Sequence, residues 1–182
     1  MQQQLAEMEI KPNMLAFKTA VAFSIYFLIL IYALKLLGIN QNNPDLGMGE
    51  KIISSLLSYL PFILAIVYVQ TTHKKELGGY ITFGRAFSAG FKTASYSGLF
   101  IALILILYYT VLDRPAFEEV MNTAIDAADG DEQKIQGIEM MRSYMVYFIG
   151  FTAAIFYTFI GLIVSLIGAA VVKKVRPLDD GY

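Results

Sequence analysis

The sequence lacks cysteine and tryptophan, has one histidine, and has only 16% charged residues. Without cysteine the chain cannot form a disulfide, a thiolate zinc site or an iron–sulfur cluster, and it has no cysteine nucleophile. A lone histidine cannot supply the two or three imidazoles that a catalytic zinc ion usually requires. A soluble domain carries about a quarter charged residues, so this charge content argues against a soluble protein.

Long uncharged segments take the place of the missing charges. Residues 143–172 contain no Asp, Glu, Lys or Arg, and three further apolar segments precede them. About twenty apolar residues in a helix cross the hydrocarbon core of a bilayer. The sequence therefore predicts an all-α polytopic membrane protein. It forms a single membrane domain over residues 1–182, with four transmembrane helices near residues 17–37, 52–69, 93–112 and 148–172.

The second of these segments contains Pro61, which removes one backbone hydrogen bond from the helix. Proline is tolerated in a transmembrane helix when neighbouring groups satisfy the carbonyl that it frees. We expect a kink at this position, with Ser54, Ser55 or Ser58 supplying the replacement donor.

The distribution of lysine and arginine predicts the orientation of the helices. The N-terminus, the second loop and the C-terminus together hold nine of these residues, and the other side holds five. Positive residues are enriched in cytoplasmic loops, so we expect both termini in the cytoplasm and the chain in the inner (plasma) membrane. His73, in the second loop, is expected to be solvated. The residues expected to meet lipid headgroups are Lys74, Lys75, Arg85, Lys92, Lys173, Lys174 and Arg176.

The loop between the third and fourth spans is acidic and has helical periodicity. Asp113 and Pro115 suit the cap and first turn of a helix, and residues 129–131 suit a turn before a second helix. The sequence thus predicts an extracytoplasmic helical hairpin over residues 115–142 that continues into the fourth span. Its apolar residues either pack the two helices together or contact a partner; they are Phe117, Val120, Met121, Ile125, Ile135 and Ile138.

Small residues recur at helical spacing in the third and fourth spans. Such stripes let helix backbones approach closely in lipid, so we expect these two helices to form the closest pair. A homodimer interface on one stripe is the alternative. The predicted packing residues are Gly90, Ala94, Gly98 and Ala102 in the third span and Ala154, Thr158, Gly161, Ser165 and Ala169 in the fourth.

Several chemistries find no support in the sequence. No span has an ionisable residue near its middle, where coupled transporters usually place one. The hydroxyls of the spans have no His or Lys base at their depth, as a serine protease would need. The acidic loop does not match a calcium-binding pattern, and the basic residues are not interleaved with nucleic-acid-reading motifs. We therefore predict no catalytic, metal or cofactor residue and no nucleic-acid partner.

Four features of the chain resemble domain-of-unknown-function family 4199, small four-span inner-membrane proteins frequent in Bacteroidota. The first feature is the set of four apolar segments. The second, before the third span, is Gly79 followed by Thr82-Phe83-Gly84 and Phe87–Gly90. The third is Pro115 with Phe117 at the start of the acidic loop, and the fourth is the basic pair Lys173-Lys174 near the C-terminus. The resemblance implies membership and topology, because the family has no assigned reaction.

Three functions remain open from the sequence, the third being an enzyme, which would require a pocket of converging polar groups that a sequence cannot show. The leading hypothesis is a non-enzymatic interaction or accessory subunit that presents the acidic hairpin to another membrane or extracytoplasmic protein. The alternative is a small oligomeric channel or permease-like protein with a pore lined by hydroxyl groups of the second and third spans. The lipid bilayer is a partner in all three cases, and a second copy of the chain is a candidate partner.

Overall fold

The computed structural model describes residues 11–39 and 46–176, so residues 1–10, 40–45 and 177–182 of the predicted domain lie outside the description. Its helices are α2 (Asn13–Leu36), α3 (Met48–Glu76), α4 (Phe83–Leu107), α5 (Arg114–Asp126) and α6 (Glu132–Val172), and a π-helical turn, η1 (Tyr108–Leu112), continues α4. Four helices, α4 being counted together with η1, are long and apolar enough to cross a membrane. The all-α, four-span prediction is confirmed.

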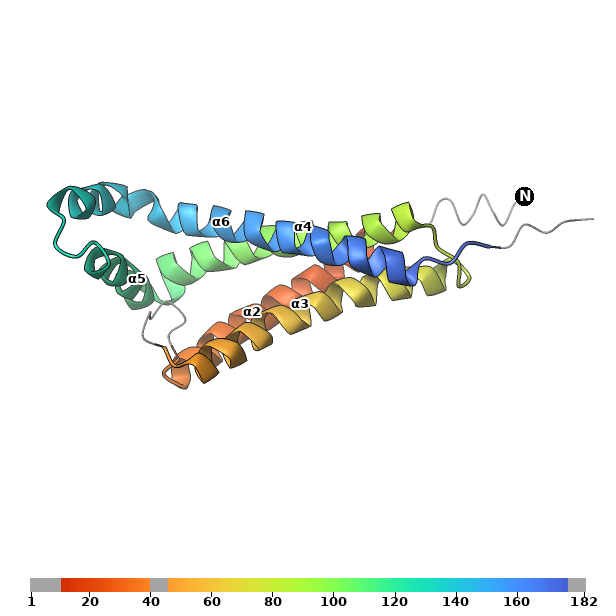
Figure 1. The fold of residues 1–182 in the computed structure, drawn as a ribbon, viewed down its shortest axis with the longest axis horizontal. Coiled ribbons are helices and arrows are strands. Elements are labelled where there is room, and N and C mark those ends of the chain that lie inside the picture. The colour runs from red at the N-terminus through yellow and green to blue at the C-terminus, as the bar shows by residue number, and fades with distance from the viewer. Residues whose placement is uncertain (1–10, 40–45, 177–182) are drawn as a thin grey trace, which may run out of the picture.

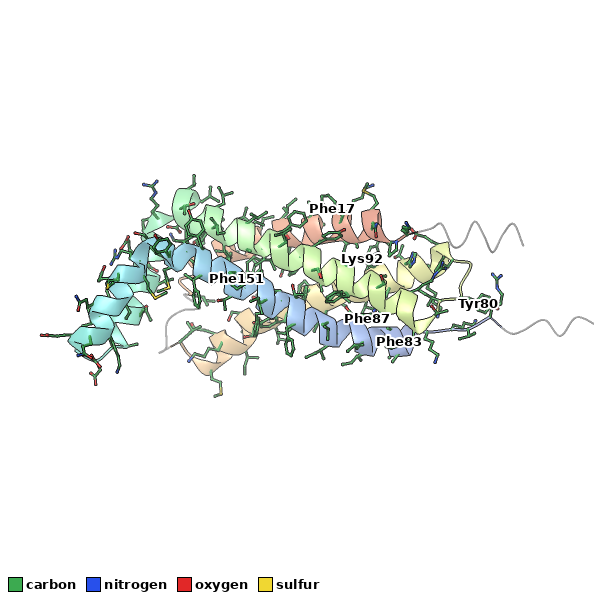
Figure 2. The ribbon with its side chains drawn as sticks, turned by 90° about the horizontal axis from the view of Figure 1, so that it is seen from above. Phe17, Tyr80, Phe83, Phe87, Lys92 and Phe151 are labelled. Atoms are coloured by element: carbon green, nitrogen blue, oxygen red, sulfur yellow. The ribbon has the colours of Figure 1, made fainter. Side chains whose placement is uncertain are left out.

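The four long helices run alternately up and down and form two pairs (Figure 1). Helices α2 and α3 lie side by side, as do α4 and α6, and the two pairs diverge toward the end where α5 lies. We call this the hairpin end, which includes Leu36, Met48 and Asp113. The opposite end, with Asn13 and Val172, is the terminal end. Large side chains such as Phe17 and Phe151, 44% and 65% exposed, cover the outside of the bundle (Figure 2), as expected for helices that face lipid.

The most extensive helix contact among the described elements is between α4 and α6. A Cβ atom added to Gly161 would lie 2.2 Å from the Cβ of Ala94, and one added to Gly98 would lie 2.7 Å from the carbonyl oxygen of Ala154. No side chain larger than hydrogen fits at either glycine without displacing the facing helix. The predicted stripes therefore face each other in antiparallel register, and the contact continues to Gly90 opposite Ser165.

Helix α3 continues through Pro61 to Glu76, beyond the predicted span. Proline at position 61 frees the carbonyl of Leu57, four residues earlier. The hydroxyl of Tyr26 on α2 donates to this carbonyl oxygen at 2.9 Å. The hydroxyls of Ser54 and Ser58 instead donate to the carbonyls of Lys51 and Ser54. The donor to the Leu57 carbonyl thus comes from a neighbouring helix, and the expectation that a serine of α3 supplies it is wrong for these two residues.

Candidate functional site

A crevice opens between the two helix pairs at the hairpin end. Its volume is about 680 Å³, within the range of roughly 300–1,000 Å³ typical of small-molecule sites. Residues of α2, α3, α4, η1, α5 and α6 line it. They are Phe27, Ile31, Leu34, Lys35, Gly38, Ile39, Leu46, Lys51, Ser54, Ser55, Ser58, Tyr59, Leu105, Tyr108, Tyr109, Ala116, Glu119, Ile149 and Tyr157.

The lining of the crevice has hydrogen-bonding capacity that the protein does not use. The hydroxyl hydrogens of Ser54 and Ser58 bind backbone carbonyls of their own helix, which leaves their oxygens as acceptors. Tyr157 is only 6% exposed, yet its hydroxyl receives no hydrogen bond from, and gives none to, any residue in the ranges that the structure describes. Among the described residues, the fully buried side-chain atoms without a partner are Gln70 Oε1 and Ser97 Oγ. The Tyr157 hydroxyl is not one of them, so it is accessible from the crevice that Tyr157 lines and is available to water or to a polar group of a bound molecule.

Aromatic packing closes the crevice toward the terminal end. The ring of Tyr157 meets that of Phe62 edge to face at a centroid distance of 5.1 Å, and Phe62 lies 5.3 Å from Phe23. Ile66 and Ile101 belong to the same buried cluster. The crevice therefore has an apolar, aromatic floor toward the terminal end.

One rim of the crevice is held by an ion pair between Lys35 of α2 and Asp113. The Asp113 side chain is 7% exposed and also accepts hydrogen bonds from the hydroxyl of Tyr108 at 2.8 Å and the backbone N–H of Ala116 at 3.2 Å. Burial alone would raise the pKa of Asp113, but the hydrogen bond from the Lys35 ammonium, together with those from Tyr108 and Ala116, outweighs burial and holds the pKa below its usual value. The predicted cap is confirmed, with Pro115 in the first turn of α5, and the same carboxylate ties α2 to the hairpin.

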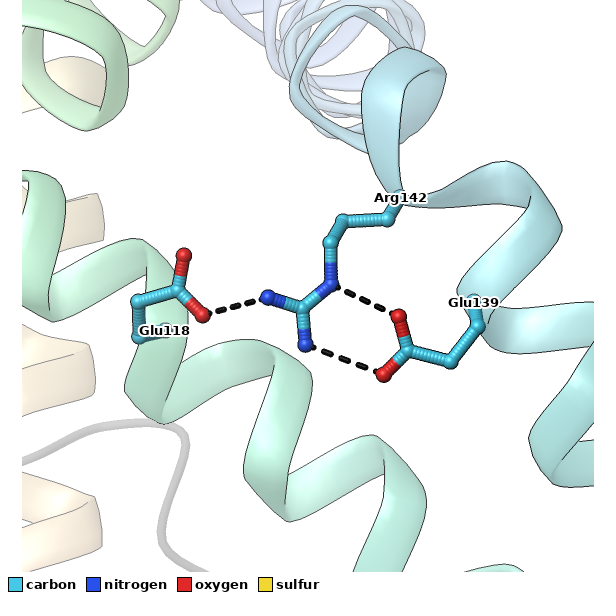
Figure 3. Close-up of polar contacts among 3 residues, drawn as sticks. All are labelled: Glu118, Glu139 and Arg142. Atoms are coloured by element: carbon cyan, nitrogen blue, oxygen red, sulfur yellow. Dashed lines mark hydrogen bonds and ion pairs between the residues drawn. The ribbon is translucent and has the colours of Figure 1, made fainter.

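The hairpin is formed by α5, a turn, and residues 132–142 of α6. Arg142 joins the two helices: its Nη1 donates to Glu118 at 2.6 Å, and its Nε and Nη2 donate to both carboxylate oxygens of Glu139 at 2.9 and 3.0 Å (Figure 3). Asp129 and Gly130 have positive φ angles of 51° and 76° at the turn. Of the six apolar residues predicted as a partner surface, Met121 is fully buried, and Phe117, Val120, Ile125, Ile135 and Ile138 are half-buried.

At the terminal end, a glutamine that the sequence reasoning missed connects three helices. Gln70 of α3 is completely buried, and its Nε2 donates to the carbonyl oxygens of Ala86 on α4 at 3.1 Å and Ser165 on α6 at 2.9 Å. Gly90 and Gly168 leave the space that the side chain occupies, since a Cβ at Gly168 would lie 2.1 Å from its Oε1. This arrangement fixes the spacing of the helices opposite the crevice.

The prediction that His73 is a solvated loop residue is wrong. His73 lies in the last turns of α3 and is 1% exposed, with its Nδ1 3.2 Å from a carboxylate oxygen of Glu76. It is buried because α3 continues past the apolar segment. His73 follows Gln70 by three residues, on the helix face that is buried against the bundle.

The predicted headgroup residues gather at the terminal end, and several contact the protein itself. Lys74 donates to the carbonyl of Val172 at 2.8 Å, and Lys92 donates to the side chain of Asn13 at 2.7 Å. The Lys174 ammonium and the Arg176 guanidinium lie 5.1 and 5.4 Å from the centre of the Tyr80 ring. The other predicted headgroup residues are Lys75, Arg85 and Lys173, of which Lys75 is exposed. At least Lys74 and Lys92 thus connect chain segments at the terminal end, and contact with lipid headgroups stays a prediction.

The sequence did contain a signal for the buried position of Gln70, namely a stripe of α3 residues spaced four apart. Ser54, Ser58, Phe62, Ile66 and Gln70 succeed one another at this spacing, and all five are buried. A polar residue that continues an apolar stripe is expected to find a partner inside the bundle. Tyr157 gave no comparable signal, because its position beside the crevice depends on the divergence of the helix pairs.

Among residues 11–39 and 46–176, no group of three or more His, Asp or Glu side chains is placed to hold a metal ion. A family model described as "Protein of unknown function (DUF4199)" matches residues 16–174. No curated protein and no solved structure matches the chain.

Proposed function

Because the chain belongs to the DUF4199 family of proteins of unknown function, we propose from its geometry that it is a non-enzymatic accessory subunit that presents the hairpin to a partner protein. The observation that carries this proposal is the fixed position of the hairpin. Helix α6 is continuous from the hairpin through its long apolar segment. The ion pair of Arg142 with Glu118 connects α6 to α5, and the ion pair of Asp113 with Lys35 connects the start of α5 to α2. A preordered surface loses less entropy on binding than a flexible loop does.

The partner that suits this surface is basic. Met121 is fully buried in the hairpin, whereas Asp126, Asp129 and Glu132 are exposed. Complementary charge accelerates encounter and selects partners. We propose that the hairpin contacts a basic patch on another membrane or extracytoplasmic protein.

The proposal places both termini in the cytoplasm of a cell with the chain in its inner membrane. Nine Lys and Arg residues on the terminal side against five on the hairpin side support this orientation. Because the chain has no cysteine, a single cysteine can be introduced at exposed Gln136 or Lys75 without background. A membrane-impermeant maleimide added to intact spheroplasts is expected to label the first variant and not the second; the opposite result overturns the orientation.

The partner itself is tested by charge reversal on the hairpin. We expect Asp126→Lys combined with Glu132→Lys to abolish specific cross-links between the hairpin and a neighbouring protein in native membranes. The matched control replaces two exposed neutral residues of the same hairpin, Gln133→Ala with Gln136→Ala, and retains the cross-links. Identical cross-links in both variants would rule out recognition through the carboxylates.

The crevice favours the channel or permease alternative as a second candidate. A hydroxyl-lined opening enters the bundle, as that alternative requires, but it ends at Tyr157 and Phe62. Conduction would require the aromatic floor to move. Flux of small polar solutes into vesicles that contain the purified protein tests this candidate, and flux that increases in Phe62→Ala would favour it.

A further inference from the structure

A second cavity, an apolar groove of about 590 Å³, lies along α3. Its lining includes Ile52, Leu56 and Leu60, which are 53%, 54% and 49% exposed. The groove therefore lies on the surface of a helix that is long and apolar enough to cross the membrane. It is lined by Met48, Lys51, Ile52, Ser55, Leu56, Tyr59, Leu60 and Ile63.

The groove and the crevice are contiguous. Lys51, Ser55 and Tyr59 line both cavities. One cavity is rich in hydroxyl groups and charges, and the other is almost entirely apolar. A molecule that fills both must have a polar part and an apolar chain.

The dimensions of the groove suit an acyl chain. Residues 48–63 extend over about 22 Å of helix, and one leaflet provides about 15 Å of hydrocarbon, half of a core of about 30 Å. The groove is therefore long enough for a chain that lies within a single leaflet.

The crevice specifies the polar part. The hydroxyl of Tyr157 at the crevice lining is available to donate to an acceptor, and the oxygens of Ser54 and Ser58 accept from a donor. Charges of both signs, on Lys35 and Glu119, lie at the lining. A head group with hydroxyls and ester carbonyls supplies donors and acceptors without adding net charge.

We propose that the crevice and the groove together bind one glycerolipid, with its hydroxyl-bearing head group in the crevice and one acyl chain in the groove. Ala116 and Glu119 of α5 line the crevice, but Asp126 and Glu132, the residues reversed in the partner test, line neither cavity. Failure of one proposal therefore leaves the other standing.

The test uses the full chain in phosphatidylcholine nanodiscs with a monoacylglycerol that carries a photoactivatable diazirine in its acyl chain. We expect cross-links concentrated on residues 52–63. Tyr157→Phe removes one oxygen and no other atom of the ring, and the loss of one hydrogen bond predicts labelling reduced about fivefold. Ser55→Phe, which blocks the junction of the two cavities, is expected to abolish the concentrated labelling.

Two controls separate a site from ordinary contact with membrane lipid. Thr152→Phe, at an exposed position of α6 outside both cavities, is expected to label as the unaltered chain does. The methyl ester of the same photoactivatable fatty acid lacks the glycerol hydroxyls and is expected to label all lipid-facing helices without preference. Equal labelling by both probes, or labelling unchanged in both Tyr157→Phe and Ser55→Phe, overturns the proposal.

Discussion

The Nε2 atom of Gln70 donates to the carbonyl oxygen of Ser165 at 2.9 Å, which connects α3 to α6 across the terminal end of the bundle. Interhelical hydrogen bonds in membrane proteins contribute about 0.6 kcal/mol on average and up to about 1.7 kcal/mol. Because this donor also binds the Ala86 carbonyl on α4, a single side chain sets the distances between three helices. These hydrogen bonds lie at the terminal end, and the crevice lies at the hairpin end.

The space around Gln70 makes a coupled pair of substitutions informative. In Gly168→Ala the new methyl group would lie 2.1 Å from Oε1 of Gln70, so we expect a loss of about 1–3 kcal/mol of stability. Gln70→Ala removes the obstructing atoms, and the double variant should be less destabilised than the two single effects add up to. Unfolding in detergent micelles, followed by circular dichroism, measures the difference. Strict additivity would contradict this packing.

The contact between α4 and α6 predicts a similar rescue. Gly161→Ala places a methyl group 2.2 Å from the Cβ of Ala94 and is expected to destabilise the bundle by about 1–3 kcal/mol. Adding Ala94→Gly should recover part of that loss. Gly137 is the control, because it lies in the same helix with no atom within 4 Å of an added Cβ. Gly137→Ala should be neutral or stabilising by up to about 1 kcal/mol. Equal destabilisation at both glycines would exclude close packing as the cause.

The hydrogen bond from Tyr26 predicts a dependence on Pro61. Tyr26→Phe leaves the Leu57 carbonyl without its donor, and we expect a loss of about 0.5–1.5 kcal/mol. In a Pro61→Ala background, the restored N–H of residue 61 satisfies that carbonyl within the helix. Tyr26→Phe should then have a smaller effect. Thermal unfolding of the four proteins completes the cycle, and an unchanged effect of Tyr26→Phe would argue against this role.

The Asp113 carboxylate predicts a defined pH dependence. Its pKa is lower in the folded protein than its usual value, which is about 3.9 in an unfolded chain. Its contribution to stability is therefore fully present above about pH 4 and is lost as the pH falls through the lowered pKa. Asp113→Asn keeps a capping residue for α5 but loses the charge that pairs with Lys35.

The free energy of unfolding of the unaltered chain and of Asp113→Asn is measured as a function of pH. The difference between the two proteins at each pH isolates the contribution of Asp113 from that of the other carboxylates. The unaltered chain should be the more stable of the two at pH 7, with a difference that stays constant to about pH 4 and shrinks below it. A difference that grows on acidification would mean that Asp113 is not stabilised as a carboxylate in the fold.

The local features of the chain followed from its sequence. Uncharged segments of sufficient length predicted the crossing helices, and Asp113 with Pro115 predicted the start of α5, because capping and helix propensity depend on neighbouring residues. The small residues at Gly98 and Gly161 showed which faces can approach closely. The predicted ends of the helices were less accurate. Helix α3 extends to Glu76, because Gln70 forms hydrogen bonds to neighbouring helices and His73 is buried against the bundle.

The sequence by itself determined the class of this protein, since an apolar chain so poor in charge has only a bilayer in which to bury four such helices. Tertiary structure decided where the polar groups meet. Gln70 and Ser165 lie 95 residues apart, and Tyr26 reaches a carbonyl on a different helix. Only the angle between the two helix pairs opens a crevice beside Tyr157 and joins it to the groove on α3. That angle results from side-chain volumes summed over several interfaces, which no local pattern in the sequence specifies.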